Sequence, residues 1–339
     1  MKKYNVAILG ATGMVGHELL KVLDQRNFPI EKLKLTASER TSGTKIDFKG
    51  KSYEVEIATP DAFKGYEIVL SSAGAGISKE LAPHIIKNGS IMIDNTSQFR
   101  MDADVPLVVP EVNSEDLRNH KGIIANPNCS TIQLVMALKP LHDSNPIKRV
   151  IVSTYQSVSG AGKEAVEEMY QQIRDILDGS YKKAEKTILP QSIGFNVIPH
   201  GGPFLDNGYT DEEIKITNET RKILNLPELL ISATSVRVPV VVGHSETVNV
   251  EFENEPDLAK IREVLSSFEG IIVQDNPDTF EYAMPFDIAG KDEVFVSRIR
   301  KDISNKNSIN MWVVADNIRK GAALNAVQIA EKMISMGLV

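Results

Sequence analysis

Residues 4–27 constrain the fold more than any other part of the sequence. A short apolar run, Tyr4 to Leu9, leads into the glycine-rich stretch GATGMVG, and the leucines that follow have helical spacing. Glycines here let a strand turn tightly into a helix and bring backbone N–H groups against a phosphate. The spacing G-x-x-G-x-x-G is one residue longer at its front than the commonest dinucleotide fingerprint, so a plain turn is the alternative. The order strand, turn, helix favours nucleotide binding.

Strands and helices continue to alternate after this turn. We expect strands at 33–37, 67–71, 90–94 and 122–125, and a helix at 77–87. Strands that alternate with helices form a parallel sheet with helices on both faces. The sequence therefore predicts an α/β fold class, with a doubly wound, Rossmann-type domain over residues 1–128.

The residues after the second predicted strand bear on the choice of dinucleotide. A NAD-binding site has an acidic residue on the ribose hydroxyls here, whereas a NADP-binding site has a cation on the 2′-phosphate. Both Glu39 and Arg40 are present. Because Arg40 is flanked by the hydroxyls of Ser38 and Thr41, we expect NADP, with a solvated loop charge as the alternative.

The second half of the sequence has longer strands rich in β-branched residues. They are expected at 148–158, 231–242, 247–253, 293–300 and 308–314, with helices at about 160–179 and 211–224. This pattern predicts an α+β domain with a mainly antiparallel sheet over residues 129–316. Residues 317–339 should then form a C-terminal helix that packs back on the first domain.

Composition excludes several classes of function. The 339 residues have a net charge of −7, which speaks against a nucleic-acid partner, and no apolar run is long enough to cross a membrane. A single cysteine cannot form an internal disulfide, and no signal peptide is recognisable. We expect a cytoplasmic protein with no metal site.

That single cysteine lies in the stretch ANPNCSTIQ. Asn-Pro-Asn is a turn, and residues 131–139 have the pattern of a helix that Pro140 ends, so Cys129 should lie at a helix N-terminus. Unpaired N–H groups at such an end favour a thiolate and can stabilise an oxyanion. The location favours a nucleophile over the alternative of a buried filler residue.

Five motifs in order along the chain resemble those of the aspartate-semialdehyde dehydrogenase family: GATGMVG, NPNCST, TYQSVSGAG, RVPVVVGHSE and ADNIRKGAALN. The resemblance extends over essentially the whole sequence. It implies NADPH-dependent reductive dephosphorylation of L-aspartyl-4-phosphate to L-aspartate 4-semialdehyde and phosphate. That reaction leads to lysine, through diaminopimelate, and to methionine and threonine.

The resemblance also implies a role for each site residue. Cys129 would form an acyl-thioester, Gln156 would orient the substrate, and His244 would act as general base and acid. On sequence alone His200 is an equal rival to His244. Arg237 would bind the substrate α-carboxylate, Glu212 its ammonium group, and Arg100 and Lys215 the phosphate, with Glu213 as an alternative to Glu212 in the predicted capping box at Thr210.

A geometric difficulty arises from the expected strand 231–242. If the strand continued unbroken from Arg237 to His244, these residues, seven positions apart, would face opposite sides of the sheet. We therefore predict a bulge or bend near Gly243.

The cofactor contacts implied by the resemblance are spread over both domains: Gly10, Thr12, Gly13, Met14, Val15, Gly16, Ser38, Arg40, Thr41, Ala73, Ser159, Gly160 and Asn317. A homodimer built through the second domain, or a tetramer, is also implied. Three alternatives stay open: N-acetyl-gamma-glutamyl-phosphate reductase, a non-catalytic NADP-binding regulator, and a cysteine hydrolase. The carboxylate of Glu212 argues against the first, because it suits a free ammonium group.

Overall fold

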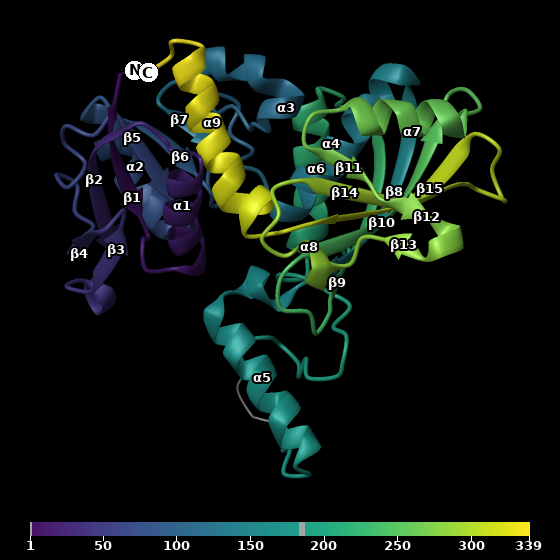
Figure 1. Cartoon of the computed structure of the whole chain (residues 1–339), viewed down its shortest axis with the longest axis horizontal. Helices are drawn as coiled ribbons and strands as arrows, with labels where there is room; N and C mark the ends of the chain where they lie inside the picture. The colour runs from purple at the N-terminus through teal and green to yellow at the C-terminus, as the bar shows by residue number, and fades with distance from the viewer. Residues whose placement is uncertain (1, 183–186) are drawn as a thin grey trace. The chain divides into compact units, whose positions relative to one another are not determined.

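The computed structural model describes residues 2–182 and 187–339, and these form two compact units (Figure 1). The first unit runs up to Asn128 and resumes at residues 322–339, and the second unit comprises the described residues between Cys129 and Gly321. Residues 317–321 thus group with the second unit, although Arg319–Ala323 form a π-helical turn that leads directly into the C-terminal helix. The Asn317 side chain explains this, because it accepts a hydrogen bond from the backbone N–H of Gly243.

The first unit contains a seven-stranded sheet in the order β3-β4-β2-β1-β5-β6-β7. All neighbours pair in parallel except β3, which pairs antiparallel with β4 at one edge. The strands are β1 (Tyr4–Leu9), β2 (Ile30–Ala37), β3 (Lys45–Phe48), β4 (Lys51–Ile57), β5 (Ile68–Ser71), β6 (Ile91–Asp94) and β7 (Ile123–Ala125). The prediction of a doubly wound Rossmann-type sheet is confirmed.

Helices cover both faces of this sheet. Val6 and Ile8 of β1 pack into one core cluster with the helices Met14–Gln25 and Leu324–Ser335, whereas Ala7 and Leu9 pack into another with the helix Ala75–Lys87. Such alternation at period two, with both sets buried, is what a central parallel strand requires. The helices of the unit are α1 (Met14–Gln25), α2 (Ala75–Lys87), the short α3 (Pro110–Asn113) and α9 (Leu324–Ser335).

At Gly16 in the glycine-rich stretch, any residue with a side chain would clash with the backbone. A Cβ atom at this position would lie 2.3 Å from the carbonyl oxygen of Gly10 and 2.7 Å from the backbone of Ala11. The first turn of α1 therefore packs directly on the turn that precedes it, as in a dinucleotide-binding loop.

The second unit contains a six-stranded sheet in the order β11-β14-β15-β10-β8-β9. The central neighbours β14, β15, β10 and β8 pair antiparallel, while the outer pairs β8–β9 and β11–β14 are parallel. The strands are β8 (Ile147–Gln156), β9 (Leu230–Arg237), β10 (His244–Phe252), β11 (Ile271–Val273), β14 (Val294–Lys301) and β15 (Ser308–Ala315), with a separate small ribbon of β12 (Asp275–Asn276) and β13 (Glu281–Tyr282). The predicted α+β domain with a mainly antiparallel sheet is confirmed.

Helix α4 (Cys129–Ser144) lies along this sheet, and most of its side chains are buried. The helix passes through Pro140, so the prediction that it ends there is wrong. A proline lacks the N–H for one helical hydrogen bond, but buried packing on either side keeps the helix intact. The other helices of the unit are α5 (Lys163–Leu177), α6 (Asp211–Leu224), α7 (Leu258–Ser267) and α8 (Pro285–Ile288).

The predicted strand over residues 231–242 is wrong in its second half. Strand β9 ends at Arg237, and residues 238–243 form a connection in which Pro239 offers no N–H donor. Val240 and Val241 accept backbone hydrogen bonds from Val158 and Ser159, which follow β8. The connection therefore crosses the end of β8, although its valines have the high strand propensity of a continuing strand.

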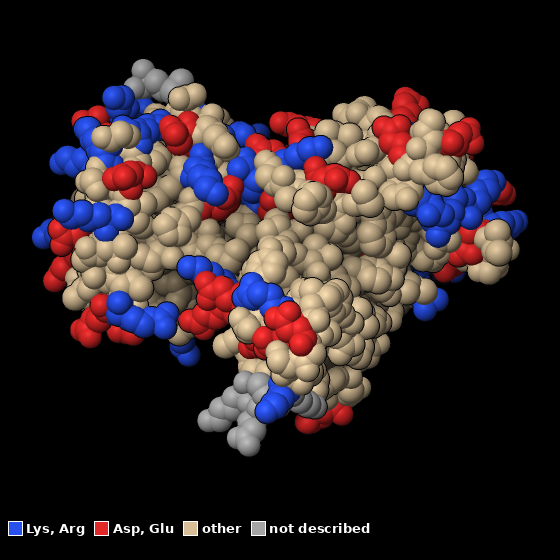
Figure 2. Space-filling view, turned by 60° about the horizontal axis from the view of Figure 1, so that its bottom comes forward, with Lys and Arg blue, Asp and Glu red and all other residues tan. Residues whose placement is uncertain are grey.

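Acidic and basic side chains are interspersed over the face seen in Figure 2, so the net charge of −7 is not gathered into one patch on that face. Among the described residues, no helix combines the length and the apolar character that crossing a bilayer would need.

Candidate active site

Three predicted site residues occupy one row at the end of the second sheet. Gln156 of β8 pairs with Arg237 of β9. On the other side of β8, Ser245 pairs with Tyr155, which places His244 opposite Gln156. All three side chains share one face because they occupy equivalent register positions. The predicted bend near Gly243 is confirmed by its φ of +96°, and the parity difficulty disappears because Arg237 and His244 lie on different strands.

Cys129 is the first residue of α4, and its Sγ lies 3.1 Å from Nε2 of His244. The N-terminus of a 16-residue helix adds partial positive charge at the sulfur. Gly321 packs closely against Cys129, since a Cβ on it would come 2.8 Å from Cβ of Cys129. The two residues form a pair with the geometry of a nucleophile and its hydrogen-bond partner.

The backbone N–H of Ser157 determines the tautomer of His244. It donates to Nδ1 at 3.0 Å, so Nδ1 is the acceptor in the neutral ring and the ring proton lies on Nε2. That proton faces Sγ of Cys129. The arrangement makes His244 a hydrogen-bond donor to a thiolate.

His244 is fully buried and neutral at physiological pH. Burial, and then the positive charge of Arg237, lower the pKa of the imidazole from 6.5 to about 3. A ring with this pKa does not hold a second proton at pH 7. The predicted role of His244 as general base and acid stays a prediction.

Arg237 brings a positive charge to the same row. Its guanidinium donates to the carbonyl oxygen of Ser157 at 2.7 Å. Burial lowers the pKa of Arg237, while the charges of Glu212 and then Cys129 raise it, so these groups lie within electrostatic reach of one another. Gly160 packs against both Arg237 and His244, since a Cβ on it would lie 3.0 Å from Nη1 and 3.2 Å from the imidazole.

The buried Gln156 amide connects two helices. Its Nε2 donates to Oγ of Ser130, the residue after Cys129, at 3.1 Å, and to Oε1 of Glu212 on α6 at 3.0 Å. Gln156 thus fixes the carboxylate of Glu212 relative to the start of α4.

The predicted capping box at the start of α6 is confirmed, and it separates the two candidate carboxylates. Glu213 accepts from the backbone N–H of Thr210 at 2.7 Å and from that of Ser235 at 2.9 Å. Both of its oxygens are engaged in holding the helix, whereas Glu212 faces Gln156. Lys215 shares this helix and pairs with Asp211.

Two residues predicted near the cofactor have structural partners in the second unit. Oδ1 of Asn317 accepts from the hydroxyl of Ser157 at 2.9 Å, and its Nδ2 donates to the hydroxyl of Ser159 at 3.0 Å. Asn317 therefore joins the loop after β8 to the turn at Gly243. As cofactor contacts, Asn317 and Ser159 remain predictions.

In the first unit, Arg100 is buried and donates to the carbonyl oxygens of Asn126 and Asn95 at 3.0 and 2.8 Å. The rival histidine, His200, belongs to the second unit. Its ring stacks on that of Phe204 with centroids 4.9 Å apart. The structure pairs His244, and not His200, with Cys129.

A hollow of about 410 Å³ lies above the glycine turn of the first unit, and Gly10, Thr12, Gly13, Ser38 and Ala73 are among its lining residues. Thr12 and the predicted Thr41 are joined by a hydrogen bond of 3.0 Å between their hydroxyls. Met14, Val15 and Gly16 form the first turn of α1, which has no acidic side chain. Glu39 also lines the hollow, while Arg40 is exposed beside it.

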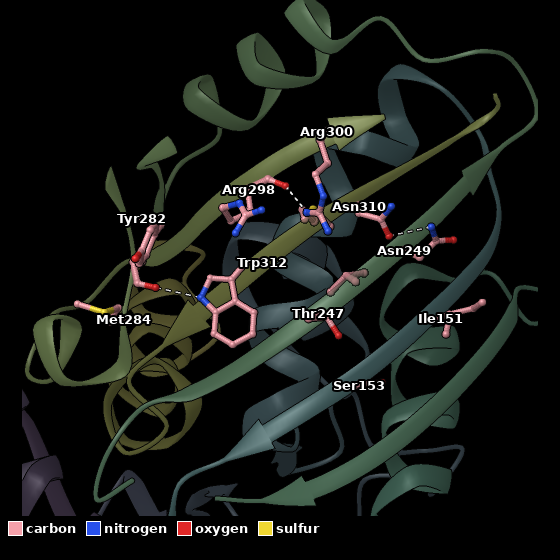
Figure 3. Close-up of a pocket in the computed structure, with 13 residues that line it drawn as sticks. Ile151, Ser153, Thr247, Asn249, Tyr282, Met284, Arg298, Arg300, Asn310 and Trp312 are labelled. Carbon is pink, nitrogen blue, oxygen red and sulfur yellow. Dashed lines mark hydrogen bonds between the residues drawn. The ribbon is translucent and has the colours of Figure 1, made fainter. Parts of the chain in front are cut away.

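A second hollow, of about 390 Å³, lies on the opposite face of the second sheet (Figure 3). Thr247, Asn249 and Trp312 line it from β10 and β15, at positions of opposite parity to His244. The indole N–H of Trp312 donates to the carbonyl oxygen of Ala283 at 2.9 Å, and Asn249 donates to Asn310 at 3.0 Å. This hollow contains none of the predicted catalytic residues.

Comparison with known proteins places the chain in a family. Residues 5–120 match the model "Semialdehyde dehydrogenase, NAD binding domain", and residues 138–320 match "Semialdehyde dehydrogenase, dimerisation domain". The aspartate-semialdehyde dehydrogenase of Aquifex aeolicus is 54% identical, with 99% of each chain covered. The chain belongs to the aspartate-semialdehyde dehydrogenase family.

Solved structures agree with this assignment. Aspartate semialdehyde dehydrogenase II from Vibrio cholerae, complexed with ASA, is 46% identical with a TM-score of 0.95 and 99% of each chain covered. Aspartate semialdehyde dehydrogenase with NADP from Candida albicans is 26% identical with a TM-score of 0.77 and full coverage of both chains. The resemblance inferred from the motifs is confirmed. The chain is an oxidoreductase of amino-acid biosynthesis with an NAD(P)-binding Rossmann domain and a dimerisation domain.

Sequence reasoning missed Ser157 and Ser130, which hold His244 and Gln156 in this dehydrogenase fold. Both lie inside the motifs that carried the resemblance, NPNCST and TYQSVSGAG. Ser157 holds His244 mainly through its backbone N–H, and the pattern of side chains in a sequence does not reveal a backbone hydrogen bond of this kind. Ser130 could have been found as the residue beside the nucleophile on the first turn of a helix.

The lowered pKa of His244 predicts a loss of stability in acid. Unfolded chains take up the histidine proton near pH 6.5, but the folded protein does so only near pH 3. The unfolding free energy should therefore fall by about 1.4 kcal/mol per pH unit from this residue as the pH decreases from 6.5. Urea unfolding followed by the fluorescence of Trp312 at several pH values should show this slope in the wild type, and His244→Asn should lack it. Parallel pH dependences in the two proteins would contradict the buried neutral imidazole.

Proposed function

We propose that the protein catalyses NADPH-dependent reductive dephosphorylation of L-aspartyl-4-phosphate to L-aspartate 4-semialdehyde and phosphate, through a thioester on Cys129. The observation that carries this proposal is the 3.1 Å contact between Sγ of Cys129 and Nε2 of His244 at the start of α4. The relative from Vibrio cholerae, whose structure contains ASA, supports the choice of substrate.

The first step is attack by the Cys129 thiolate on the acyl carbon. Three features stabilise the thiolate: the N-terminus of α4, the Nε2–H of His244 and the nearby charge of Arg237. The S–C bond forms as the bond from the acyl carbon to the phosphate oxygen breaks, and phosphate leaves with the bonding electrons. The product is a thioester on Cys129.

The second step frees the aldehyde. When bound, the reduced cofactor supplies the hydride that converts the thioester carbon to the aldehyde level. The S–C bond then breaks, and Cys129 leaves as a thiolate that is again stabilised by Nε2–H of His244. A neutral histidine serves both steps because each one needs a hydrogen-bond donor at the sulfur or at the adjacent oxygen.

Charge complementarity supports the substrate assignment. Arg237 would hold the α-carboxylate, and Glu212, fixed by Gln156, would bind the free ammonium group. Lys215 and Arg100 remain the proposed phosphate contacts. An N-acetylated substrate would leave the carboxylate of Glu212 without a charged partner, which disfavours the N-acetyl-gamma-glutamyl-phosphate reductase alternative.

The first unit has features that fit a dinucleotide. The first turn of α1 contains no acidic residue, and Gly13, which precedes the helix, lines the hollow. Phosphates bind well at such helix ends. NADP is proposed over NAD because Arg40, in the sequence Ser38-Glu39-Arg40-Thr41, is exposed next to a residue that lines the hollow, and because the relative from Candida albicans has NADP in its structure.

A homodimer is proposed through the face of the second sheet that carries the hollow in Figure 3. Phe280 and Phe286 near this face are 79% and 91% exposed, unusual fractions for aromatic side chains. The matched dimerisation domain spans this sheet, which supports self-association there.

One assay tests the proposed reaction. Aspartate semialdehyde, phosphate and NADP should give phosphate-dependent formation of reduced cofactor, measured by absorbance. Cys129→Ala should lower the rate to background while the affinity for NADP, measured by calorimetry, changes less than about twofold. Undiminished turnover in this variant would refute the thioester mechanism, and activity only with the N-acetylated, longer semialdehyde would favour the alternative enzyme.

Cofactor choice is tested by Arg40→Ala. The loss of a guanidinium–phosphate contact should raise the KM for NADP roughly tenfold and leave the KM for NAD nearly unchanged. Lys121→Ala is the matched control, because it removes an exposed cation of the first unit that does not line the hollow, and it should leave both KM values unchanged. Equal KM values for NADP in the wild type and Arg40→Ala would remove the proposed role of Arg40.

The dimer is tested by Asn310→Arg, which adds a third guanidinium to a hollow that Arg298 and Arg300 already line. Sedimentation equilibrium should detect a dimer for the wild type and a monomer for the variant. Lys260→Ala, on the exposed surface of α7, is the control and should stay dimeric. If Asn310→Arg dimerises as tightly as the wild type, the interface does not include this hollow.

A further inference from the structure

A second polar row lies directly beneath the catalytic row. Glu246 follows His244 by two residues on β10 and pairs with Thr154 of β8, which in turn pairs with Ser235 of β9. These three side chains have the same parity as His244, Gln156 and Arg237, so they occupy the same face one step further from the end of the sheet. The row after them, Val248, Val152 and Ala233, is apolar.

Helix α4 carries a matching residue. Gln133 follows Cys129 by four residues, about 6 Å along a helix, and Glu246 follows His244 by two residues, about 6.6 Å along a strand. Gln133 and Glu246 therefore join the same helix to the same strand one layer below the catalytic pair. The Gln133 side chain interacts with the Glu246 carboxyl and lowers its pKa, which shows that the two side chains are neighbours.

The layer is buried and polar. The exposed fractions of Gln133 and Glu246 are 1% and 0%, and those of Thr154 and Ser235 are both 0%. The side-chain polar atoms of these four residues make no direct hydrogen bond of good geometry with any other atom of residues 2–182 and 187–339. Buried polar groups without such bonds cost stability, so their concentration under an active site calls for a functional explanation.

The protonation state of Glu246 suits a pair with an amide. Burial raises the pKa of its carboxyl well above the ordinary value, more than Gln133 lowers it. The residues that face it from β8, β15 and α4 are Thr154, Val313 and Gln133, none of which titrates. Titratable groups on these and adjoining elements include Cys129 on α4, His244 on the same strand, Arg237 on β9, and the buried Glu213 and Glu219 on α6.

A neutral carboxyl has one O–H donor and one carbonyl acceptor, and the amide of Gln133 offers the complementary donor and acceptor. An ionised carboxylate would instead leave a buried charge facing the amide oxygen as well as its N–H groups. Because neither side chain has another hydrogen-bond partner among the described residues, the neutral form can join the helix to the strand through this complementary pair, whereas the ionised form would loosen them.

We propose that Glu246 is a positioning residue of the active site, which acts through Gln133 to hold the first turns of α4 and so keeps Cys129 in place against His244. This inference rests on the proposed role of Cys129 as the nucleophile. It adds a residue that touches neither substrate nor cofactor but sets the distance between the reacting sulfur and its hydrogen-bond donor.

The test compares Glu246→Leu with Glu246→Gln, which is isosteric with the protonated carboxyl. One measurement is the kcat and KM for oxidation of aspartate semialdehyde. The other is the rate constant for alkylation of Cys129 by iodoacetamide at pH 7, which needs no substrate or cofactor and is specific because the chain has one cysteine. A wild type that does not oxidise aspartate semialdehyde would refute the proposed function. The alkylation rates would still test whether Glu246 positions Cys129.

Glu246→Leu should lower kcat about tenfold or more with KM within about twofold, because small displacements of a nucleophile are costly, and it should slow alkylation about fivefold. Glu246→Gln should keep at least half of both wild-type rates. Val248→Ala, one row deeper on the same strand, is the control for destabilisation alone and should keep wild-type kcat and alkylation rate. Wild-type rates in Glu246→Leu, or equal losses in the Leu and Gln variants, would overturn the proposal.

A pH series keeps the proposal testable if Glu246→Leu does not fold. Because the folded pKa of this carboxyl is raised, the wild type should lose stability relative to Glu246→Gln as the pH rises from about 4.5, by roughly 3 °C of Tm per pH unit. The kcat of the wild type should fall in alkali relative to that of Glu246→Gln. A Tm difference that is constant with pH would show that the carboxyl is not held neutral and would overturn the proposal.

Discussion

The hydrogen bond from the backbone N–H of Ser157 to Nδ1 of His244 is the interaction on which the chemistry of the second unit depends. It assigns the ring proton to Nε2, which faces Cys129, and burial keeps the ring neutral. A backbone donor cannot be removed by a side-chain change and does not titrate. The histidine is therefore held as a donor to the sulfur over the whole physiological pH range.

The path of the chain explains how this bond forms. Residues 238–243 cross the end of β8 between two strands that flank it, so Arg237 and His244 arrive on either side of Gln156. Positive φ at Gly243 directs the chain into β10, and a Cβ there would lie 2.9 Å from Pro285. Three side chains of different chemistry thus share one row, and α4 supplies the sulfur above them. The polar row that contains Glu246 supports this arrangement from below.

Sequence alone predicted both sheets, most helices and the residues now paired at the site, because glycine spacing, hydrophobic periodicity and the family motifs are local signals. It failed at residues 238–242, where valines have strand propensity but the hydrogen bonds go to a different segment, and at Pro140, where burial overrides a helix-breaking residue. The tautomer of His244 and the neutrality of Glu246 could not be predicted, since both depend on tertiary neighbours. The hydrogen bonds of Glu213 to the helix cap and of Glu212 to Gln156 distinguish the two carboxylates, and the second of these bonds depends on a tertiary neighbour.

The tautomer of His244 is the central claim, and nitrogen NMR of protein labelled with ¹⁵N-histidine measures it most directly. His244→Asn identifies the resonances of this residue among the six histidines. The account predicts a neutral ring with the proton on Nε2 and none on Nδ1, unchanged between pH 5 and pH 8. An imidazolium signal in that range, or a proton on Nδ1, would contradict it.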